Sequence, residues 1–314
     1  MLVKKPSSAP TLKDAVWIDL CNPTDAERAE VEGALGLCLP SRADIEEIET
    51  SSRVYVDDGA LYLSTPMLTG DDCLTHGLTA VGFVLTRASL VTLRFARVAA
   101  FEQLLEKAEK SAEPKANDAF LKLLETVVDH SADALERAGG ELETISHRAF
   151  SAEHPRKRNH EKTSEDLRAA LRHLGRMSDG ISHLRDSLLG MARIAAFVHE
   201  TARETHLGGA QPRLSAIKGD IASLTDYQAH LNAKVQFLLD ATLGFINIQQ
   251  NDIVKTLTIV SVAGVPPVLI AGIYGMNFRV MPELAWPLGY PYALALIVVS
   301  TLIPLAWLKW RGWM

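Results

Sequence analysis

The chain has 314 residues, of which 32 are basic and 38 acidic, giving a formal net charge of −6. Residues 251–314 carry only four basic and two acidic side chains, so residues 1–250 hold 28 and 36, a net charge of −8. An acidic region repels nucleic acid and attracts divalent cations, so the composition excludes a nucleic-acid-binding protein; an ordinary solvated surface is the alternative to cation binding.

The N-terminal segment lacks the apolar core of a signal peptide, and residues 1–14 are predicted to be a disordered lead-in. The three cysteines, Cys21, Cys38 and Cys73, form no CxxC pair. Their odd number suits neither a zinc site nor a disulfide framework, so we interpret them as reduced structural thiols. We therefore expect the large N-terminal domain to lie in the cytoplasm.

Residues 15–98 combine strand and helix signals. Residues 16–20 (VWIDL) alternate like a strand, and residues 22–27 (NPTDAE) are typical of a turn followed by a capped helix. This pattern predicts a small α+β unit that contains a sheet. Its further apolar runs lie at 60–63, 80–85 and 90–93, and turn formers at 57–59 and 70–72 separate them.

Residues 98–206 are rich in Ala, Leu, Glu, Lys and Arg, with apolar residues at helical spacing. The polar stretch 151–165 contains Pro155 and is predicted to form the tip of a helical hairpin. Three histidines (His147, His154 and His160) lie near this tip, but their spacing does not place them on one helix face. We interpret them as part of a solvated turn rather than a metal site.

Residues 213–265 contain no proline and keep a helical apolar pattern throughout. Such a helix would be roughly 80 Å long at ~1.5 Å per residue. Because this length far exceeds that of an ordinary globular helix, we expect one element to run from the soluble domain into the bilayer.

Two uncharged apolar runs, at 257–274 and 292–307, are predicted to span a membrane. A buried soluble hairpin is the alternative, but four of the five tryptophans lie in the last 29 residues, which is typical of membrane interfaces. Lys255 precedes the first run, and Lys309 and Arg311 follow the second. The positive-inside rule then places both termini in the cytoplasm and residues 275–291 outside.

Two helices cannot enclose an aqueous path, so a transporter of this design must assemble as a ring. One stripe of residues along the first span could line the aqueous path. Alternatively, the same stripe is only a surface on which helices pack. This stripe consists of Asn251, Val254, Leu257 or Thr258, Ser261, Val265, Val268 and Gly272.

The loop between the spans contains YGMNF at 274–278 and MPEL at 281–284. The order and place of these motifs resemble the signature of the CorA family of magnesium transporters. Residues 245–248 (FINI), Trp286, residues 289–291 (GYP) and residues 16–20 resemble the same family, so the likeness covers most of the chain.

The resemblance implies a homopentameric funnel whose first span lines the pore, with Gly275, Met276 and Asn277 as the selectivity filter. Neutral amide oxygens suit an ion that releases its water reluctantly. Asn251, Val254 and Leu257 would form a hydrophobic inner gate. The sequence departs from the family at Val254, where Met is common, and at Arg279, where an acid is usual; a ring of Glu283 would offset Arg279.

The resemblance also implies regulation by cytoplasmic magnesium bound between subunits. Asp220 lies where the family tends to place one such carboxylate, and Asp71 or Asp72 of the next subunit would be its partner. The alternative is an exposed acid near a helix start, which stabilises that helix by ~0.3–1 kcal/mol.

The sequence therefore predicts an α+β cytoplasmic domain with long helices, then two transmembrane helices, in a funnel-shaped homo-oligomer of the inner membrane. We expect a passive, potential-driven magnesium transporter without enzymatic activity or covalent cofactor, with magnesium as both cargo and regulator. Zinc transport of the ZntB type, cobalt or nickel transport, and a non-conducting membrane-anchored scaffold are the alternatives. The predicted segments are 1–98 (α/β unit), 99–250 (helical region), 251–274 (first span), 275–291 (external loop), 292–308 (second span) and 309–314 (basic tail).

Overall fold

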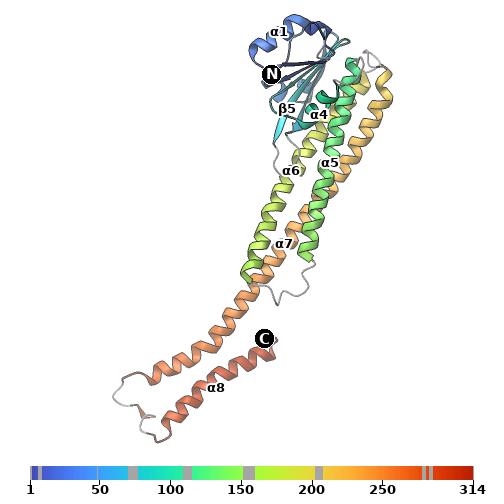
Figure 1. Cartoon of the computed structure of the whole chain (residues 1–314). Helices are drawn as coiled ribbons and strands as arrows, with labels where there is room; N and C mark the ends of the chain where they lie inside the picture. The colour runs from blue at the N-terminus through green and yellow to red at the C-terminus, as the bar shows by residue number, and fades with distance from the viewer. Residues whose placement is uncertain are drawn as a thin grey trace. The chain divides into compact units, whose positions relative to one another are not determined.

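The computed structural model divides the chain into two compact units (Figure 1). Unit 1 contains Met1–Lys157 and Arg168–Leu239, and unit 2 contains Arg158–Leu167 and Asp240–Met314. The structure describes residues 2–5, 9–47, 49–69, 77–108, 115–150, 160–201, 208–277, 281–282 and 286–313.

Unit 1 contains a six-stranded sheet with the order β1-β2-β6-β5-β4-β3, in which only the β2–β6 pair is parallel. The predicted α+β unit is thereby confirmed. Its strands are β1 (Leu2–Lys5), β2 (Trp17–Cys21), β3 (Val54–Asp57), β4 (Ala60–Leu68), β5 (Leu78–Leu85) and β6 (Leu90–Arg94).

Strand β1 corrects the prediction of a disordered lead-in over residues 1–14. It pairs antiparallel with β2, Leu2 lying opposite Leu20 and Lys5 opposite Trp17. A four-residue strand gains its backbone hydrogen bonds only from a neighbour, so local sequence alone could not reveal it. After β1, the short 3-10 helix η1 (Leu12–Asp14) leads into β2.

Local sequence rules explain the predicted turns. Thr24 caps α1 (Asp25–Leu35): its hydroxyl accepts from the Glu27 amide, and the Glu27 carboxylate accepts from the Thr24 amide at 2.9 Å. This backbone hydrogen bond lowers the pKa of the Glu27 carboxyl. Asp58 and Gly59 join β3 to β4 with φ values of 45° and 75°, as a two-residue type I′ hairpin requires.

A buried polar network fixes the parallel β2–β6 pair. Arg94 Nη2 donates to Asp19 Oδ2 at 2.9 Å, and Thr92 Oγ1 donates to Asp19 Oδ1 at 2.7 Å. Trp17 Nε1 in turn donates to Thr92 Oγ1 at 3.0 Å. Because Asp19 and Arg94 are paired, the strands can bury both charges in the sheet.

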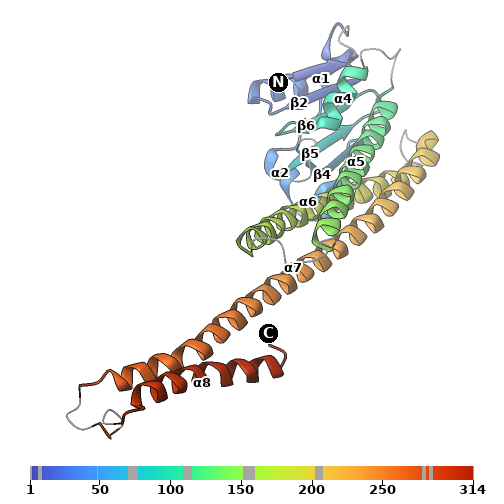
Figure 2. The same cartoon turned by 60° about the horizontal axis from the view of Figure 1, so that its bottom comes forward.

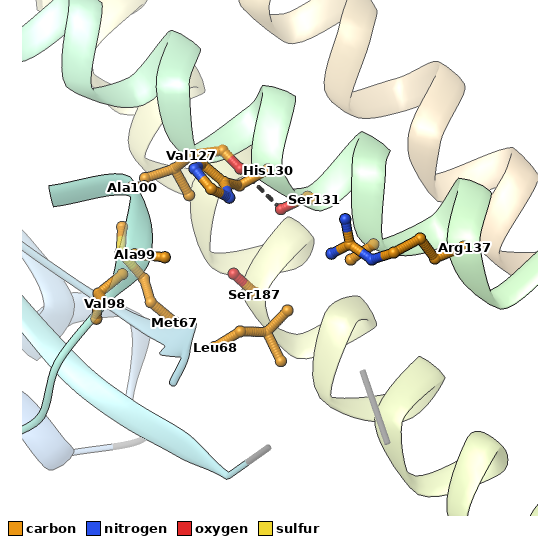
Figure 3. A pocket seen from close by; sticks show the side chains of 11 residues that line it. Met67, Leu68, Val98, Ala99, Ala100, Val127, His130, Ser131, Arg137 and Ser187 are labelled. Carbon is orange, nitrogen blue, oxygen red and sulfur yellow. Dashed lines mark hydrogen bonds between the residues drawn. The ribbon is translucent and has the colours of Figure 1, made fainter. Parts of the chain in front are cut away.

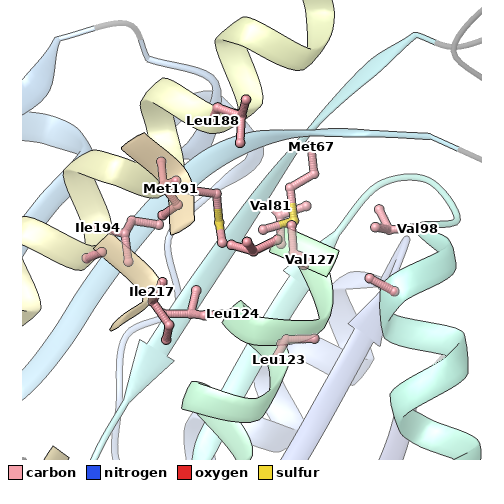
Figure 4. Close-up of a cluster of buried hydrophobic side chains, with 14 of the residues drawn as sticks. Met67, Val81, Val98, Leu123, Leu124, Val127, Leu188, Met191, Ile194 and Ile217 are labelled. Atoms are coloured by element: carbon pink, nitrogen blue, oxygen red, sulfur yellow. The ribbon is translucent and has the colours of Figure 1, made fainter. Parts of the chain in front are cut away.

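The two faces of the sheet bury separate apolar clusters. Val31 of α1 and Ile45 of α2 (Arg42–Glu46) help to cover one face, and α3 (Thr50–Arg53) leads into β3. Helices α4 (Ala99–Ala108), α5 (Ala116–Phe150) and α6 (His160–Thr201) belong to the other cluster, together with the first part of α7 (Gln211–Tyr274). In that cluster Met67 and Val81 of the sheet meet Leu124, Val127 and Met191 of the helices (Figure 4).

Close approaches lock the helices of unit 1 to the sheet and to each other. A Cβ added at Gly190 of α6 would lie 1.9 Å from Thr65 Oγ1 of β4, so only glycine permits this contact. A Cβ at Gly139 of α5 would lie 2.6 Å from Tyr227 Oη of α7. The helix backbones can approach these partners closely because both positions lack a side chain.

Ion pairs connect α5 to the first part of α7. Arg213 donates to the Glu125 carboxylate from Nε at 3.0 Å and from Nη2 at 2.9 Å, which raises the pKa of the guanidinium. Lys234 donates to Glu143, and this hydrogen bond lowers the pKa of the Glu143 carboxyl. These pairs hold the beginning of α7 against the helical layer.

Where residues 98–206 are described they form α4, α5 and α6, which confirms the helical prediction there, with one boundary corrected. Helix α6 already begins at His160, so residues 160–165 of the predicted hairpin tip are helical. Residues 151–159, including His154, lie outside the described residues. The 3-10 helix η3 (Gly208–Ala210) precedes α7.

Unit 2 contains the end of α7 and all of α8 (Gly289–Trp310), which lie side by side in both views (Figures 1 and 2). Helix α7 continues through 64 residues from unit 1 into unit 2, which confirms the predicted single long element.

Candidate ion pathway along helix α7

Helices α7 and α8 are long and apolar enough to cross a membrane. Within unit 2, the half-buried positions of both helices recur at helical spacing, as expected for two helices that pack against each other. On α7 they include Thr258, Val262, Pro266, Ile270 and Tyr274, and on α8 Ala293, Ile297, Thr301, Leu305 and the buried Leu308.

The predicted pore stripe lies on the other side of α7. At about 100° per residue, the mean direction of the stripe from Asn251 to Gly272 lies roughly 130–150° from that of the half-buried positions facing α8. All seven of its residues are exposed. Val254, Leu257, Val265 and Val268 are 58 %, 65 %, 54 % and 70 % exposed. The stripe therefore lacks a partner within the described part of the chain and is available to another copy, water or lipid.

Thr258, the alternative to Leu257 in the stripe, belongs to the half-buried face instead. Its hydroxyl donates to the Val254 carbonyl oxygen at 2.8 Å, and the Thr256 hydroxyl donates to that of Asp252 at 2.9 Å. A hydroxyl that donates to a carbonyl oxygen one turn earlier has its hydrogen-bond donor satisfied within its own helix, so it needs no partner helix.

Two adjacent prolines, Pro266 and Pro267, lie inside α7, a feature that the sequence reasoning left unused. Proline has no amide hydrogen, so the carbonyl oxygens of Val262 and Ala263 lose their usual donors one turn earlier. Both prolines are half-buried on the side of α8. The sequence already contained this signal, because the two prolines interrupt an otherwise continuous run of helix-compatible apolar residues.

The proposed filter residues follow the last turn of α7. The Gly275 amide donates to the Ala271 carbonyl oxygen at 2.9 Å, and the Met276 amide to that of Ile273 at 3.2 Å. A Cβ at Gly275 would lie 3.1 Å from the Ala271 oxygen, so glycine here allows a close approach rather than a positive φ. Asn277 is exposed, and its amide makes no hydrogen bond within the part of the chain described here.

Several predicted residues fall elsewhere or outside the described residues. Asp220 is exposed near the start of α7, in unit 1. Glu283, Asp71, Asp72 and Arg279 lie outside the described residues. Among the residues that are described, no three His, Cys, Asp or Glu side chains gather as a metal-binding set.

A small pocket in unit 1 lies between the end of β4, the start of α4, and helices α5 and α6 (Figure 3). His130, Ser131, Arg137 and Ser187 provide its polar lining, and the Ser131 hydroxyl donates to the Val127 carbonyl oxygen at 2.9 Å. Its volume is about 30 Å³, room for about two water molecules. The pocket is therefore too small for an organic substrate.

Comparisons with known proteins connect this arrangement to a family. The sequence profile described as "CorA-like Mg2+ transporter protein" matches residues 13–310. The magnesium transport protein CorA of Haemophilus ducreyi is 34% identical over 311 residues, covering 98% of this chain and 95% of the relative. The protein of the same name from Escherichia coli K12 is 34% identical over 305 residues, covering 96% and 93%.

Solved structures share the fold. The complete CorA magnesium transporter from Methanocaldococcus jannaschii matches with a TM-score of 0.73 at 21% identity, covering 95% of this chain and 91% of that one. Full-length CmaX matches with a TM-score of 0.67 at 16% identity, covering 95% and 88%. These matches confirm the predicted α+β domain with long helices and two C-terminal apolar helices.

Proposed function

The chain belongs to the CorA family of magnesium transporters, and from this premise we propose that it carries magnesium ions across the cytoplasmic membrane. The curated relatives are named as transporters rather than enzymes. Magnesium would be the cargo and the regulator, with no covalent cofactor.

The exposed stripe of α7 is the observation that carries the proposal. One copy provides a single line of small and apolar residues opposite α8, and one line cannot enclose water. Several copies arranged in a ring would turn their stripes toward a common axis, with α8 outside. The family resemblance implies five copies, a homopentamer. Unit 1 of each copy would then contribute to a funnel.

Asn277 would form the outer selectivity filter. Magnesium dehydrates reluctantly, so an entrance that contacts its water shell through neutral oxygens binds it weakly enough for release. The Asn277 amide is exposed at the end of α7 and is not engaged by described residues, so it is available for this contact. Gly275 and Met276 complete the ring, with Glu283 nearby in sequence.

The inner gate would consist of Asn251, Val254 and Leu257. A narrow ring of apolar side chains excludes water and therefore ions. Val254 and Leu257 are exposed on the stripe, so in a ring they would face the axis. Lys255, which follows Val254, lies 4.0 Å from Asp252, so its charge is partly balanced at this level of the helix.

Transport would be passive. The membrane potential contributes about 2.3 kcal/mol per elementary charge per 100 mV, and twice that for a divalent ion. With both termini in the cytoplasm, an inside-negative potential drives the cation inward through the loop end of α7. Cytoplasmic magnesium would close the ring by binding between Asp220 and the next subunit's loop at 70–72.

The first prediction tests the filter by uptake into proteoliposomes under an inside-negative potential. Asn277→Ala removes the amide oxygen and is expected to abolish magnesium uptake, since no other described side chain replaces it. Asn277→Asp adds a charge and is expected to slow uptake by holding the ion too tightly. Zinc, cobalt and nickel are measured in parallel to establish the ion preference.

Asn232→Ala is the matched control, because it makes the same change on α7 within unit 1. It is expected to leave uptake at the parental rate. Parental uptake by Asn277→Ala at equal protein content would refute the filter. Absence of magnesium uptake by the unaltered protein would refute the transport function itself.

A further inference from the structure

The C-terminal end of α8 is closed by a hydrogen-bonded turn. The Gly312 amide donates to the Lys309 carbonyl oxygen at 3.1 Å, and the Trp313 amide donates to that of Leu308 at 3.0 Å. Gly312 has a φ of 75°. These two bonds around a left-handed glycine are a Schellman motif, which ends the helix at this point. We call residues 307–313 the C-terminal cap.

The C-terminal cap holds exposed aromatic rings next to cations. The Arg311 guanidinium lies 5.3 Å from the centre of the Trp307 ring, within the range of a cation–π interaction. Trp310 is 83 % exposed, and Trp313 is 45 % exposed. Indole rings favour the membrane interface, where one part of the ring is apolar and the N–H group meets polar partners.

No acidic side chain lies close in sequence to the cations of the C-terminal cap. Residues 284–314 contain no Asp or Glu, whereas Lys309 and Arg311 are both basic. Among the described residues, neither has a carboxylate within 4.0 Å. Lys255, at the beginning of the other span, differs because Asp252 lies 4.0 Å from it. Two of the six Lys and Arg residues of unit 2 therefore lie on one short turn that contains no acidic side chain.

We propose that the C-terminal cap is a binding platform for the headgroup of an anionic phospholipid. Lys309 and Arg311 would both contact oxygens of the headgroup phosphate, while Trp310 and Trp313 pack against the glycerol and upper acyl region. A guanidinium held over a ring is already oriented, so it loses less freedom when it binds phosphate. Gly312 acts as the positioning residue that sets this geometry.

A lipid is favoured over a soluble anion because the platform is continuous with an apolar span. The exposed side chains that precede it on α8 include Leu302, Ile303 and Trp307. The proposal depends on α8 crossing the bilayer, which is part of the proposed function, but not on the ion pathway along α7. The lipid-binding proposal can therefore fail while magnesium transport is confirmed, and magnesium transport can fail while lipid binding is confirmed.

The experiment measures lipid selectivity by tryptophan quenching. Trp286→Phe removes the one membrane-region tryptophan outside the C-terminal cap, so quenching in that region then reports on the cap. The full-length variant is reconstituted into vesicles of phosphatidylcholine and phosphatidylglycerol. Two preparations are compared, one with brominated acyl chains on phosphatidylcholine and one with them on phosphatidylglycerol. Stronger quenching by brominated phosphatidylglycerol is expected, and its relative association constant should fall about fivefold for each basic residue removed, in Lys309→Gln and Arg311→Gln.

Three controls separate the platform from general effects. Lys255→Gln removes a balanced charge and should leave the selectivity unchanged. Gly312→Asn preserves the left-handed residue and should retain selectivity, whereas Gly312→Val should lose it as Arg311→Gln does. Equal quenching by both lipids in the Trp286→Phe protein would overturn the proposal by itself, whatever the other variants show. Displacement of phosphatidylglycerol by inorganic phosphate would overturn it in favour of a soluble-anion site.

Discussion

At the residue scale, the functional positions of this protein are defined by exposure rather than by unusual chemistry. The stripe residues of α7 are mostly small or apolar, and Asn277 is a neutral amide. Such side chains acquire a transport role only when symmetry repeats them around an axis. A regulatory carboxylate follows the same logic, because one exposed acid binds magnesium weakly and several shared sites must act together.

Asp220→Ala is predicted to weaken inhibition by internal magnesium while leaving the unblocked flux similar. The ion favours the closed ring only by its preference for the paired carboxylates, so losing one partner raises the half-inhibition concentration, by about tenfold for each 1.4 kcal/mol lost. A flux titration against internal magnesium measures this. Asp226→Ala, which removes another exposed acid of α7, is the control and should not shift the curve. Identical titrations for the two variants would remove Asp220 from the regulatory site.

At the element scale, the attachment of α6 to the sheet depends on one glycine. An added Cβ at Gly190 would lie 1.9 Å from Thr65 Oγ1, 2.9 Å from Thr65 Cβ and 3.2 Å from Pro66 Cδ. The backbone of β4 is held by strands on both sides, so it cannot easily move away. The close contact therefore fixes the position of α6 on the sheet.

Gly190→Ala is predicted to destabilise the protein by ~1–3 kcal/mol, as overpacking of a dense core typically does. Gly175→Ala on the same helix is the matched control, because nothing lies within 4 Å of its added Cβ. There alanine should be neutral or stabilise the helix by up to about 1 kcal/mol. Thermal unfolding of the full protein in detergent, followed by circular dichroism, compares the two. Equal midpoints would contradict the close packing.

The same scale shows what sequence could and could not predict. Periodicity and capping rules identified β2, the start of α1 and the long α7, because these signals are local. Strand β1 was missed because its pairing is supplied by β2, and the Gly190 contact was invisible because it joins residues more than 100 positions apart. For the site, the sequence predicted which residues of α7 share a face, but only the placement of α8 revealed that this face is exposed.

At the scale of the whole molecule, α7 belongs to both compact units. Its first part is held by Arg213, Tyr227 and Lys234 against α5, and its last part lies beside α8. Any change of unit 1 that moves α7 would therefore act on the same helix that carries the proposed gate. Residues 211–250 of α7 precede the predicted first span, so the proposed topology puts unit 1 and the gate end of α7 on the same side of the membrane.

The last prediction tests that topology. Lys255 precedes the first span and the C-terminal cap follows the second, so the positive-inside rule places both in the cytoplasm. In a variant lacking its native cysteines, a cysteine introduced by Ala285→Cys should react with a membrane-impermeant maleimide in intact cells. A cysteine introduced by Met314→Cys should react only after permeabilisation, which also serves as the control for reactivity. Labelling of position 314 in intact cells would place the C-terminus outside, and a cation driven inward by the potential would then enter at the gate end of α7 rather than at the loop end.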